Sequence, residues 1–200
     1  MIRLGMAMES NFFAMISRMK FIERWSLMRN SRQENLSEHS LEVSMLSHAL
    51  AVISNERFGN SLNAEKAALI GIYHDASEII TGDMPTPIKY FNENIQKAYK
   101  DVEKHAAIRL HHMLPEYMQK SFGDIFYPAE EDAYLWKLVK AADKLAALIK
   151  CIEEEKAGNT EFISAKKSIH KHIDALKLKE VDLFIKEFLP AYSKTLDELN

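Results

Sequence analysis

The stretch that decides the fold is Ala64-Glu-Lys-Ala-Ala-Leu-Ile-Gly-Ile-Tyr-His-Asp-Ala-Ser-Glu78. Helix-forming and apolar residues dominate it, yet it places an imidazole and a carboxylate side by side at His74 and Asp75. Such groups cost free energy in a core-facing segment unless a partner compensates them. A divalent metal ion satisfies both groups at once, so the stretch predicts a helix that carries a metal site.

Two further segments supply ligands for the same ion. His39 lies in Ser37-Glu-His-Ser40, and Asp143 lies in Lys140-Ala-Ala-Asp-Lys144. Each residue alone has a simpler explanation, since a lone core His is usually satisfied by hydrogen bonds and Asp143 can pair with the adjacent lysine. Together, however, they form a mixed nitrogen and oxygen set, which suits Co, Mn, Zn or Fe(II) better than Ca. We expect one divalent transition metal, with open positions of the kind that hydrolysis requires.

The composition bounds the class of protein. The chain has 200 residues, 47% of them hydrophobic and 28% charged, which is typical of a soluble globular protein. We expect a single domain over residues 1–200, with its core between about residues 12 and 196. The net charge is −3 with both signs interspersed, so we expect no nucleic-acid partner and no membrane partner.

The compartment is inferred from two features. The single cysteine, Cys151, cannot form an internal disulfide, which fits a reducing environment. The first eight residues contain no apolar run long enough for a signal peptide or a membrane span. We therefore expect a cytoplasmic protein, whose true start could be Met1, Met6 or Met8.

Few residues break helices, since there are only six Gly and five Pro. Asn35 followed by Glu38 resembles a capping box, and Asn63 is a good N-cap for a helix that we expect to continue through Glu78. The pattern predicts an all-α bundle of about six to eight helices. The remaining long ones are expected at about residues 94–113, 130–156, 160–176 and 180–196.

The order His … His-Asp … Asp resembles the signature of the HD-domain metal phosphohydrolases. Three stretches are more specific and resemble the bacterial HD-domain 5′-deoxynucleotidases: residues 24–30 (Arg-Trp-Ser-Leu-Met-Arg-Asn), residues 34–40 and residues 73–89 with their Thr-Gly-Asp-Met-Pro-Thr-Pro loop. The resemblance extends from about residue 12 to 196. It implies an HD-domain helical fold and a homodimer. It also implies metal-dependent removal of phosphate from 2′-deoxyribonucleoside 5′-monophosphates.

The resemblance also implies roles for particular residues. Glu78 follows His74 by one helical turn, about 6 Å at the Cβ atoms, so it can reach an attacking water or the leaving oxygen. Arg24 offers a planar fork for phosphate oxygens, and Trp25 beside it can pack on the sugar. We expect catalytic roles for Glu78, Arg24 and Asp83; substrate contacts from Arg24, Trp25, His39, Asp75, Asp83, Met84, Pro85, Thr86 and Asp143; and metal ligation by His39, His74, Asp75 and Asp143.

Three other functions account for parts of the sequence. Another HD phosphohydrolase, acting on a nucleoside triphosphate or a phosphodiester, would need a larger basic cluster than the motifs contain. A non-catalytic nucleotide-sensing module would not need both Glu78 and Arg24. A purely structural helical protein would leave His74 and Asp75 unexplained. The sequence therefore favours the enzyme, while the base preference stays open.

Overall fold

The computed structural model describes residues 9–89 and 91–200, so the three alternative starts lie outside the described residues. Within those ranges all regular structure is helical, apart from one isolated antiparallel bridge between Glu23 and Asn35. The all-α prediction is confirmed. None of the described helices combines the length and hydropathy that a membrane span requires.

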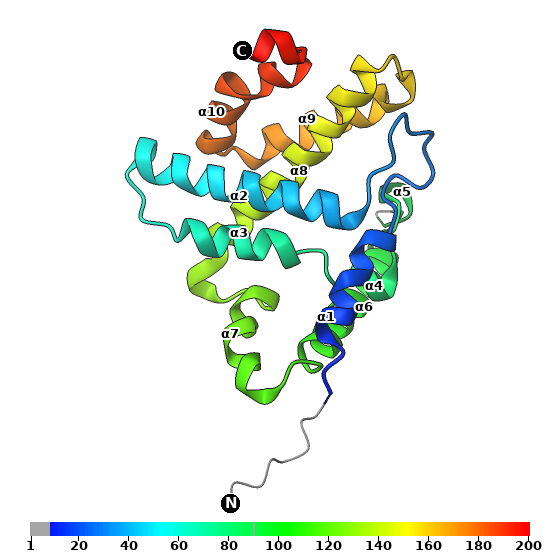
Figure 1. The fold of residues 1–200 in the computed structure, drawn as a ribbon, viewed down its shortest axis with the longest axis vertical. Coiled ribbons are helices and arrows are strands. Elements are labelled where there is room, and N and C mark those ends of the chain that lie inside the picture. The colour runs from blue at the N-terminus through cyan, green and yellow to red at the C-terminus, as the bar shows by residue number, and fades with distance from the viewer. Residues whose placement is uncertain (1–8, 90) are drawn as a thin grey trace, which may run out of the picture.

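Most of the helices follow one another through short connections, and a longer loop, residues 22–35, precedes α2 (Figure 1). Seven described helices have nine residues or more, within the expected six to eight: α2 (Leu36–Phe58), α3 (Ala64–Tyr73), α6 (Glu93–His111), α7 (Glu116–Phe126), α8 (Ala133–Lys156), α9 (Ile163–Leu176) and α10 (Lys179–Glu187). Three shorter helices are α1 (Phe12–Ile16), α4 (Glu78–Thr81) and α5 (Thr86–Lys89). Five 3₁₀ turns extend or join them: Ser17–Phe21, Glu130–Asp132, Thr160–Phe162, Leu189–Ser193 and Leu196–Leu199.

Side-chain caps fix where the central helices begin. The Asn35 side chain accepts hydrogen bonds from the backbone N–H groups of Ser37 and Glu38, while Glu38 accepts one from the backbone N–H of Asn35. Asn63 caps α3 by accepting from the backbone N–H of Lys66. Both predicted caps are confirmed, and the first of them places His39 in the opening turn of α2.

The two capped helices lie side by side, and α8 crosses behind them (Figure 1). A glycine permits the close approach, because a Cβ atom at Gly71 would lie 2.7 Å from the Cα of Ser44. Side chains such as Leu50, Ile70 and Leu145 are fully buried between the three helices. This tight triple contact brings the start of α2, the end of α3 and the middle of α8 to one place.

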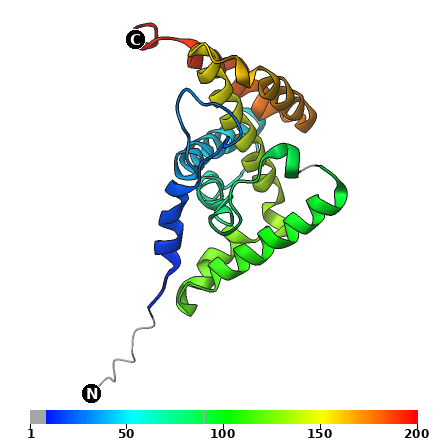
Figure 2. The ribbon, with the colours of Figure 1, turned by 90° about the vertical axis from the view of Figure 1, so that its right-hand side faces the viewer.

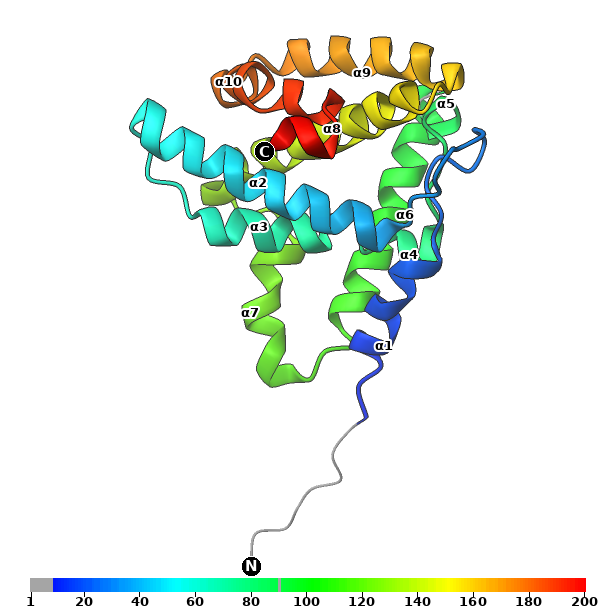
Figure 3. The same ribbon diagram turned by 45° about the horizontal axis from the view of Figure 1, so that its top comes forward.

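The outer helices cover this centre from two sides. Helices α9 and α10 form a layer above α2 and α8 (Figure 3). Figure 2 shows the same order from the side, with α9 and α10 at the top, α2 and α3 in the middle and α6 below. A smaller apolar cluster joins α1, α6 and α7 around Phe12 and Leu110, with Tyr73 and Phe122 packed against it. The site described next lies where α2, α3 and α8 meet.

The helix expected to run through Glu78 is wrong in its second half. Helix α3 ends at Tyr73, residues 74–77 form a turn, and α4 begins at Glu78. The turn is held by backbone hydrogen bonds between residues three apart, such as Ala76 N to Tyr73 O at 3.0 Å and Glu78 N to Asp75 O at 2.9 Å. This tighter winding changes the directions of His74, Asp75 and Glu78 relative to a straight helix.

Two other boundaries differ from the prediction. Helix α7, which begins directly after Pro115, was not predicted, although Met118, Phe122 and Ile125 have helical spacing. Helix α10 ends at Glu187 and not near residue 196, because Pro190 has no N–H to continue the ladder and lies in a separate 3₁₀ turn. The predicted stop after α8 is correct, since Gly158 takes the left-handed conformation with φ +80°.

Candidate active site

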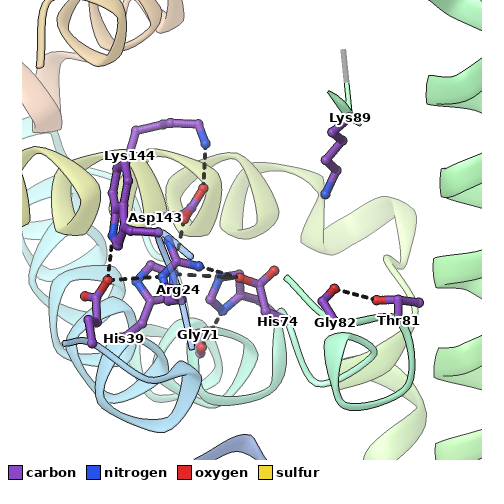
Figure 4. A network of polar contacts seen from close by, with 12 residues as sticks. Arg24, His39, Gly71, His74, Thr81, Gly82, Lys89, Asp143 and Lys144 are labelled. Carbon is purple, nitrogen blue, oxygen red and sulfur yellow. Dashed lines mark hydrogen bonds and ion pairs between the residues drawn. The ribbon is translucent and has the colours of Figure 1, made fainter. Parts of the chain in front are cut away.

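Four side chains from three helices converge on one point. His39 comes from α2, His74 caps α3, Asp75 follows it in the turn, and Asp143 comes from the middle of α8. One ligand atom of each lies within 4.8 Å of the others. Figure 4 shows His39, His74 and Asp143 pointing toward one another beside Arg24. The structure thus brings together all four residues that the sequence singles out as metal ligands.

The chemistry of this group fits a divalent cation. His74 Nδ1 lies 2.8 Å from the carbonyl oxygen of Gly71, which accepts a hydrogen bond from it and leaves Nε2 facing Asp75 Oδ2 at 2.9 Å. His39 Nε2 lies 3.2 Å from Asp143 Oδ1. Among the described residues, neither buried Nε2 makes a hydrogen bond of normal geometry. Two unsatisfied imidazole nitrogens beside two carboxylates form a donor set that a transition metal completes.

The two carboxylates are held in the ionised form. Burial alone would raise the pKa of Asp75, but the adjacent imidazole of His74 outweighs it and lowers that pKa. Burial is likewise outweighed at Asp143, where Lys144 and His39 lower the pKa. The ammonium of Lys144 lies 2.8 Å from Asp143 Oδ2, so the pairing weighed as a simpler explanation does occur. It engages Oδ2, while Oδ1 faces His39.

Arg24 borders the same group from the loop before α2. Its Nη1 lies 3.7 Å from Asp75 Oδ2, and its Nε donates to Glu34 Oε2 at 3.2 Å. The guanidinium side chain is only 11% exposed. Burial opposes its charge, but the carboxylates of Asp143, Asp75 and Glu34 raise its pKa. The guanidinium therefore stays charged at the edge of the group formed by His39, His74, Asp75 and Asp143, which is called the metal group below.

Trp25 is held in an unusual backbone conformation next to Arg24. Its φ is +57°, in the left-handed region that a bulky L-residue rarely adopts. The indole packs 5.2 Å from the ring of Phe162, and its Nε1 donates to Glu34 Oε2 at 2.8 Å. The sequence interpretation missed Glu34, which has no helical periodicity to mark it. Only its place in the stretch of residues 34–40 could have drawn attention to it.

Glu78 lies under the site at the start of α4, with a residue exposure of 4%. Burial raises the pKa of its carboxyl to about 9, and the negative charges of Asp75 and Asp83 act in the same direction. Glu78 therefore carries a proton at neutral pH. Its Oε2 is buried and has no hydrogen-bond partner within the described ranges, so this oxygen lacks the partner that a buried polar atom ordinarily has.

The predicted substrate loop follows Gly82, whose φ is +73°. Burial raises the pKa of Asp83, while the charge of Arg24 works against this rise and shows that the two groups interact. Met84 and Pro85 are half-buried, and Thr86 is exposed at the first position of α5. Figure 4 shows Thr81 and Gly82 beside the metal group, at the entry to this loop.

Comparison with known proteins shows which family this chain belongs to. A family model described as 5′-deoxynucleotidase YfbR-like matches residues 11–192. The chain belongs to the YfbR-like 5′-deoxynucleotidase family. The protein named 5′-deoxynucleotidase YfbR from Escherichia coli O127:H6 (strain E2348/69 / EPEC) is 50% identical over 196 residues, which cover 96% of each chain. The relative from Escherichia coli O1:K1 / APEC matches to the same extent. The predicted family is confirmed.

Solved structures confirm the HD-domain fold of this YfbR-like chain. An HD-domain phosphohydrolase from Listeria innocua superposes with a TM-score of 0.78 at 22% identity, covering 91% of this chain and 88% of its own. The cyanophage S-2L HD phosphohydrolase DatZ, bound to dA and one catalytic Zn²⁺ ion, gives a TM-score of 0.63 at 18% identity and covers 91% and 96%. At these sequence identities the comparison establishes the fold alone.

We predict that Asp75→Ala loses its bound metal. Removing a ligand should weaken metal affinity by about 100-fold or more, since even the partners of metal ligands contribute 10–100-fold. Metal content per chain is measured after dialysis against trace metal, and far-ultraviolet circular dichroism checks that the helices are retained. Asp101→Asn, an exposed carboxylate on α6, is the matched control and should bind like the wild type. Unchanged metal content in Asp75→Ala, or full activity in chelator, would contradict the assignment.

Proposed function

We infer that this chain is a metal-dependent 5′-deoxynucleotidase, a phosphoric monoester hydrolase. It hydrolyses 2′-deoxyribonucleoside 5′-monophosphates to the deoxyribonucleoside and phosphate. The observation that carries this function is the arrangement of Arg24 and Trp25, a phosphate fork and an indole on consecutive residues beside a four-ligand metal group. In a nucleoside 5′-monophosphate the phosphate and the sugar are likewise adjacent, so Arg24 can bind the one and Trp25 the other.

The residues divide the chemistry among them. His39, His74, Asp75 and Asp143 would hold one divalent ion, which supplies Lewis acidity toward the phosphate and activation of water when it is bound. Arg24 orients the phosphate oxygens through its planar fork. As a water oxygen bonds to phosphorus and the bond from phosphorus to the 5′ oxygen breaks, Glu78 donates its proton to that 5′ oxygen. A proton released by the attacking water then restores the acid form of Glu78. The products are then a neutral alcohol and inorganic phosphate.

Trp25 and the loop of residues 83–86 are assigned to the nucleoside. An indole against the 2′ carbon gains apolar contact with deoxyribose and leaves a 2′-hydroxyl without a partner, at a cost of about 1–3 kcal/mol. The Asp83 carboxylate acts beside Arg24 at the reacting end, while Met84, Pro85 and Thr86 line the approach from α5. His39, Asp75 and Asp143 would contact the substrate at its phosphate, because they belong to the metal group.

The other functions are less well supported. A nucleoside triphosphate or a polymeric phosphodiester brings more negative charge, whereas the surroundings of Arg24 are the carboxylates of Glu34, Asp75, Asp83 and Asp143. A sensing module would not require a buried, protonated Glu78. We propose Co, Mn or Zn as the metal, a single HD domain over residues 1–200, a cytoplasmic location and no nucleic-acid or membrane partner.

The function is tested by phosphate release from dAMP and AMP with each of these metals. We expect kcat/KM to favour dAMP by about 10- to 100-fold, the range that an unpaired buried hydroxyl would produce. Trp25→Ala should reduce this ratio toward one even where total activity falls, because it opens space at the 2′ position. Trp136→Phe is the control and should keep the wild-type ratio. Equal use of dAMP and AMP by the wild type would overturn the deoxy preference.

Glu78→Gln tests the proton donor. The amide has nearly the same shape and cannot donate a proton, so turnover should fall by about 10²–10⁴-fold while metal and nucleotide still bind. In the wild type, kcat should decline as pH rises through the pKa of Glu78, because the acid form is the active one, and the charge of the bound ion sets that midpoint below about 9. The variant should lack that decline. Near-normal turnover at pH 7 would remove Glu78 from the reaction.

We also propose that the protein is a homodimer that uses the outer face of α2. Leu41, Met45 and Val52 are exposed on that helix at spacings of four and seven residues, which form one stripe suited to an identical helix in a two-fold pair. Light scattering should give twice the chain mass of 23.0 kDa for the wild type. Met45→Glu should shift the mass toward one chain, whereas Val102→Glu, an exposed apolar position on α6, should not. A monomeric wild type refutes the proposal.

A further inference from the structure

One carboxylate oxygen holds both residues that we assign to phosphate and sugar. Glu34 Oε2 accepts a hydrogen bond from Arg24 Nε at 3.2 Å and another from Trp25 Nε1 at 2.8 Å. Glu34 is 9% exposed, and nothing in the reaction described above uses it. A buried charge that binds two consecutive side chains fixes their relative position more tightly than two separate partners would.

The backbone ties Glu34 to the same loop. Arg24 N donates to the carbonyl oxygen of Glu34 at 2.9 Å, and Leu36 N donates to the carbonyl oxygen of Ile22 at 2.9 Å. These bonds flank the antiparallel bridge between Glu23 and Asn35. Since Asn35 is the N-cap of α2, the loop is anchored directly to the helix that carries His39. Glu34 therefore links the substrate side chains to the metal group through a short, fixed path.

We propose that Glu34 is a positioning residue that sets the spacing between the Arg24 guanidinium and the Trp25 indole. Phosphate binding and selection against the 2′-hydroxyl then depend on a single carboxylate. This inference rests on the proposed function for the roles of Arg24 and Trp25. It goes further by naming the residue that couples the two.

Its neighbours set Glu34 apart from the other carboxylates near Arg24. Glu34 binds Arg24 at Nε, while Nη1 of the fork is directed toward Asp75. Of the other carboxylates near Arg24, Asp75 and Asp143 are expected metal ligands and Asp83 is assigned to the substrate, so Glu34 alone among these four has no other assigned role. At Trp25 the indole hydrogen bond and the contact with Phe162 retain a ring whose backbone has φ +57°. A backbone in that region persists only where its surroundings hold it.

Glu34→Gln is the first test. The amide oxygen can take the place of Oε2 and accept both N–H groups, but it lacks the negative charge, so both hydrogen bonds weaken, that from the Arg24 guanidinium most. We expect kcat/KM for dAMP to fall by about 10- to 100-fold, the scale of a misplaced substrate contact. The ratio of kcat/KM for dAMP to that for AMP should fall as well. Glu23→Gln removes an exposed carboxylate one residue before Arg24 and should change neither value. Bound metal should stay at the wild-type level in both variants.

The second test is spectroscopic and does not depend on activity. The chain has two tryptophans, so a ¹H–¹⁵N spectrum contains two indole signals, which Trp136→Phe assigns. Glu34→Gln should move the Trp25 signal upfield, because a charged acceptor is replaced, and leave the Trp136 signal in place. Glu23→Gln should move neither. A merely structural role for Glu34 would lower the melting temperature without changing the sugar ratio.

Trp25→Phe separates the two partners and serves if Glu34→Gln does not fold. It keeps an aromatic ring but removes the N–H that Glu34 binds, so the sugar ratio should fall. Added to this variant, Glu34→Gln should not change the ratio further, while kcat/KM for dAMP still drops through Arg24. An unmoved Trp25 signal with wild-type kinetics in Glu34→Gln would overturn the proposal, as would an unchanged ratio in Trp25→Phe. If the wild type shows no sugar preference, the proposed function fails there, whereas the indole shift still tests Glu34.

Discussion

The meeting of two partly buried carboxylates, Asp75 and Asp143, beside two imidazoles is the constraint on which the rest of the structure depends. Charges of the same sign repel at these distances, so their shared position is costly without a cation. Neighbouring charged residues reduce this repulsion. Lys144 engages one oxygen of Asp143, and Arg24 approaches Asp75. Burial raises the pKa of Glu78, and the negative charges of Asp75 and Asp83 add to that rise.

Local signals were enough to predict the parts of the site that lie at helix ends. Asn35 and Asn63 cap helices through contacts within three residues, so the start of α2 and the position of His39 were readable from the sequence. The turn after Tyr73 was not, because hydrophobic spacing continues through it and only the tertiary packing directs His74 and Asp75 toward α8. Helix α7 was missed although its spacing is helical, and Pro190 ends α10 earlier than its apolar pattern suggests.

Glu34 illustrates a different limit. Its side chain acts ten residues back along the chain, across a loop whose shape depends on a left-handed tryptophan and one backbone bridge. No periodicity or cap marks such a residue. The Arg-Trp pair is one of the motifs that resemble the family. The carboxylate that binds both of its side chains, Glu34, looks in the sequence like any other charged loop residue. Three-dimensional contacts were needed to separate this carboxylate from its exposed neighbour Glu23.

Gly71 affects the orientation of His74 as well as the spacing between α2 and α3. Its carbonyl oxygen also fixes the orientation of the His74 ring, so one residue sets both the spacing of the helices and the direction of a ligand. A methyl group there would meet Ser44 at 2.7 Å, against ordinary contacts of 3.4 Å and above. Relief of that contact would displace α3 by more than the roughly 0.2 Å tolerance of metal–ligand distances. In this fold, interior packing and coordination chemistry therefore cannot drift independently as the sequence diverges.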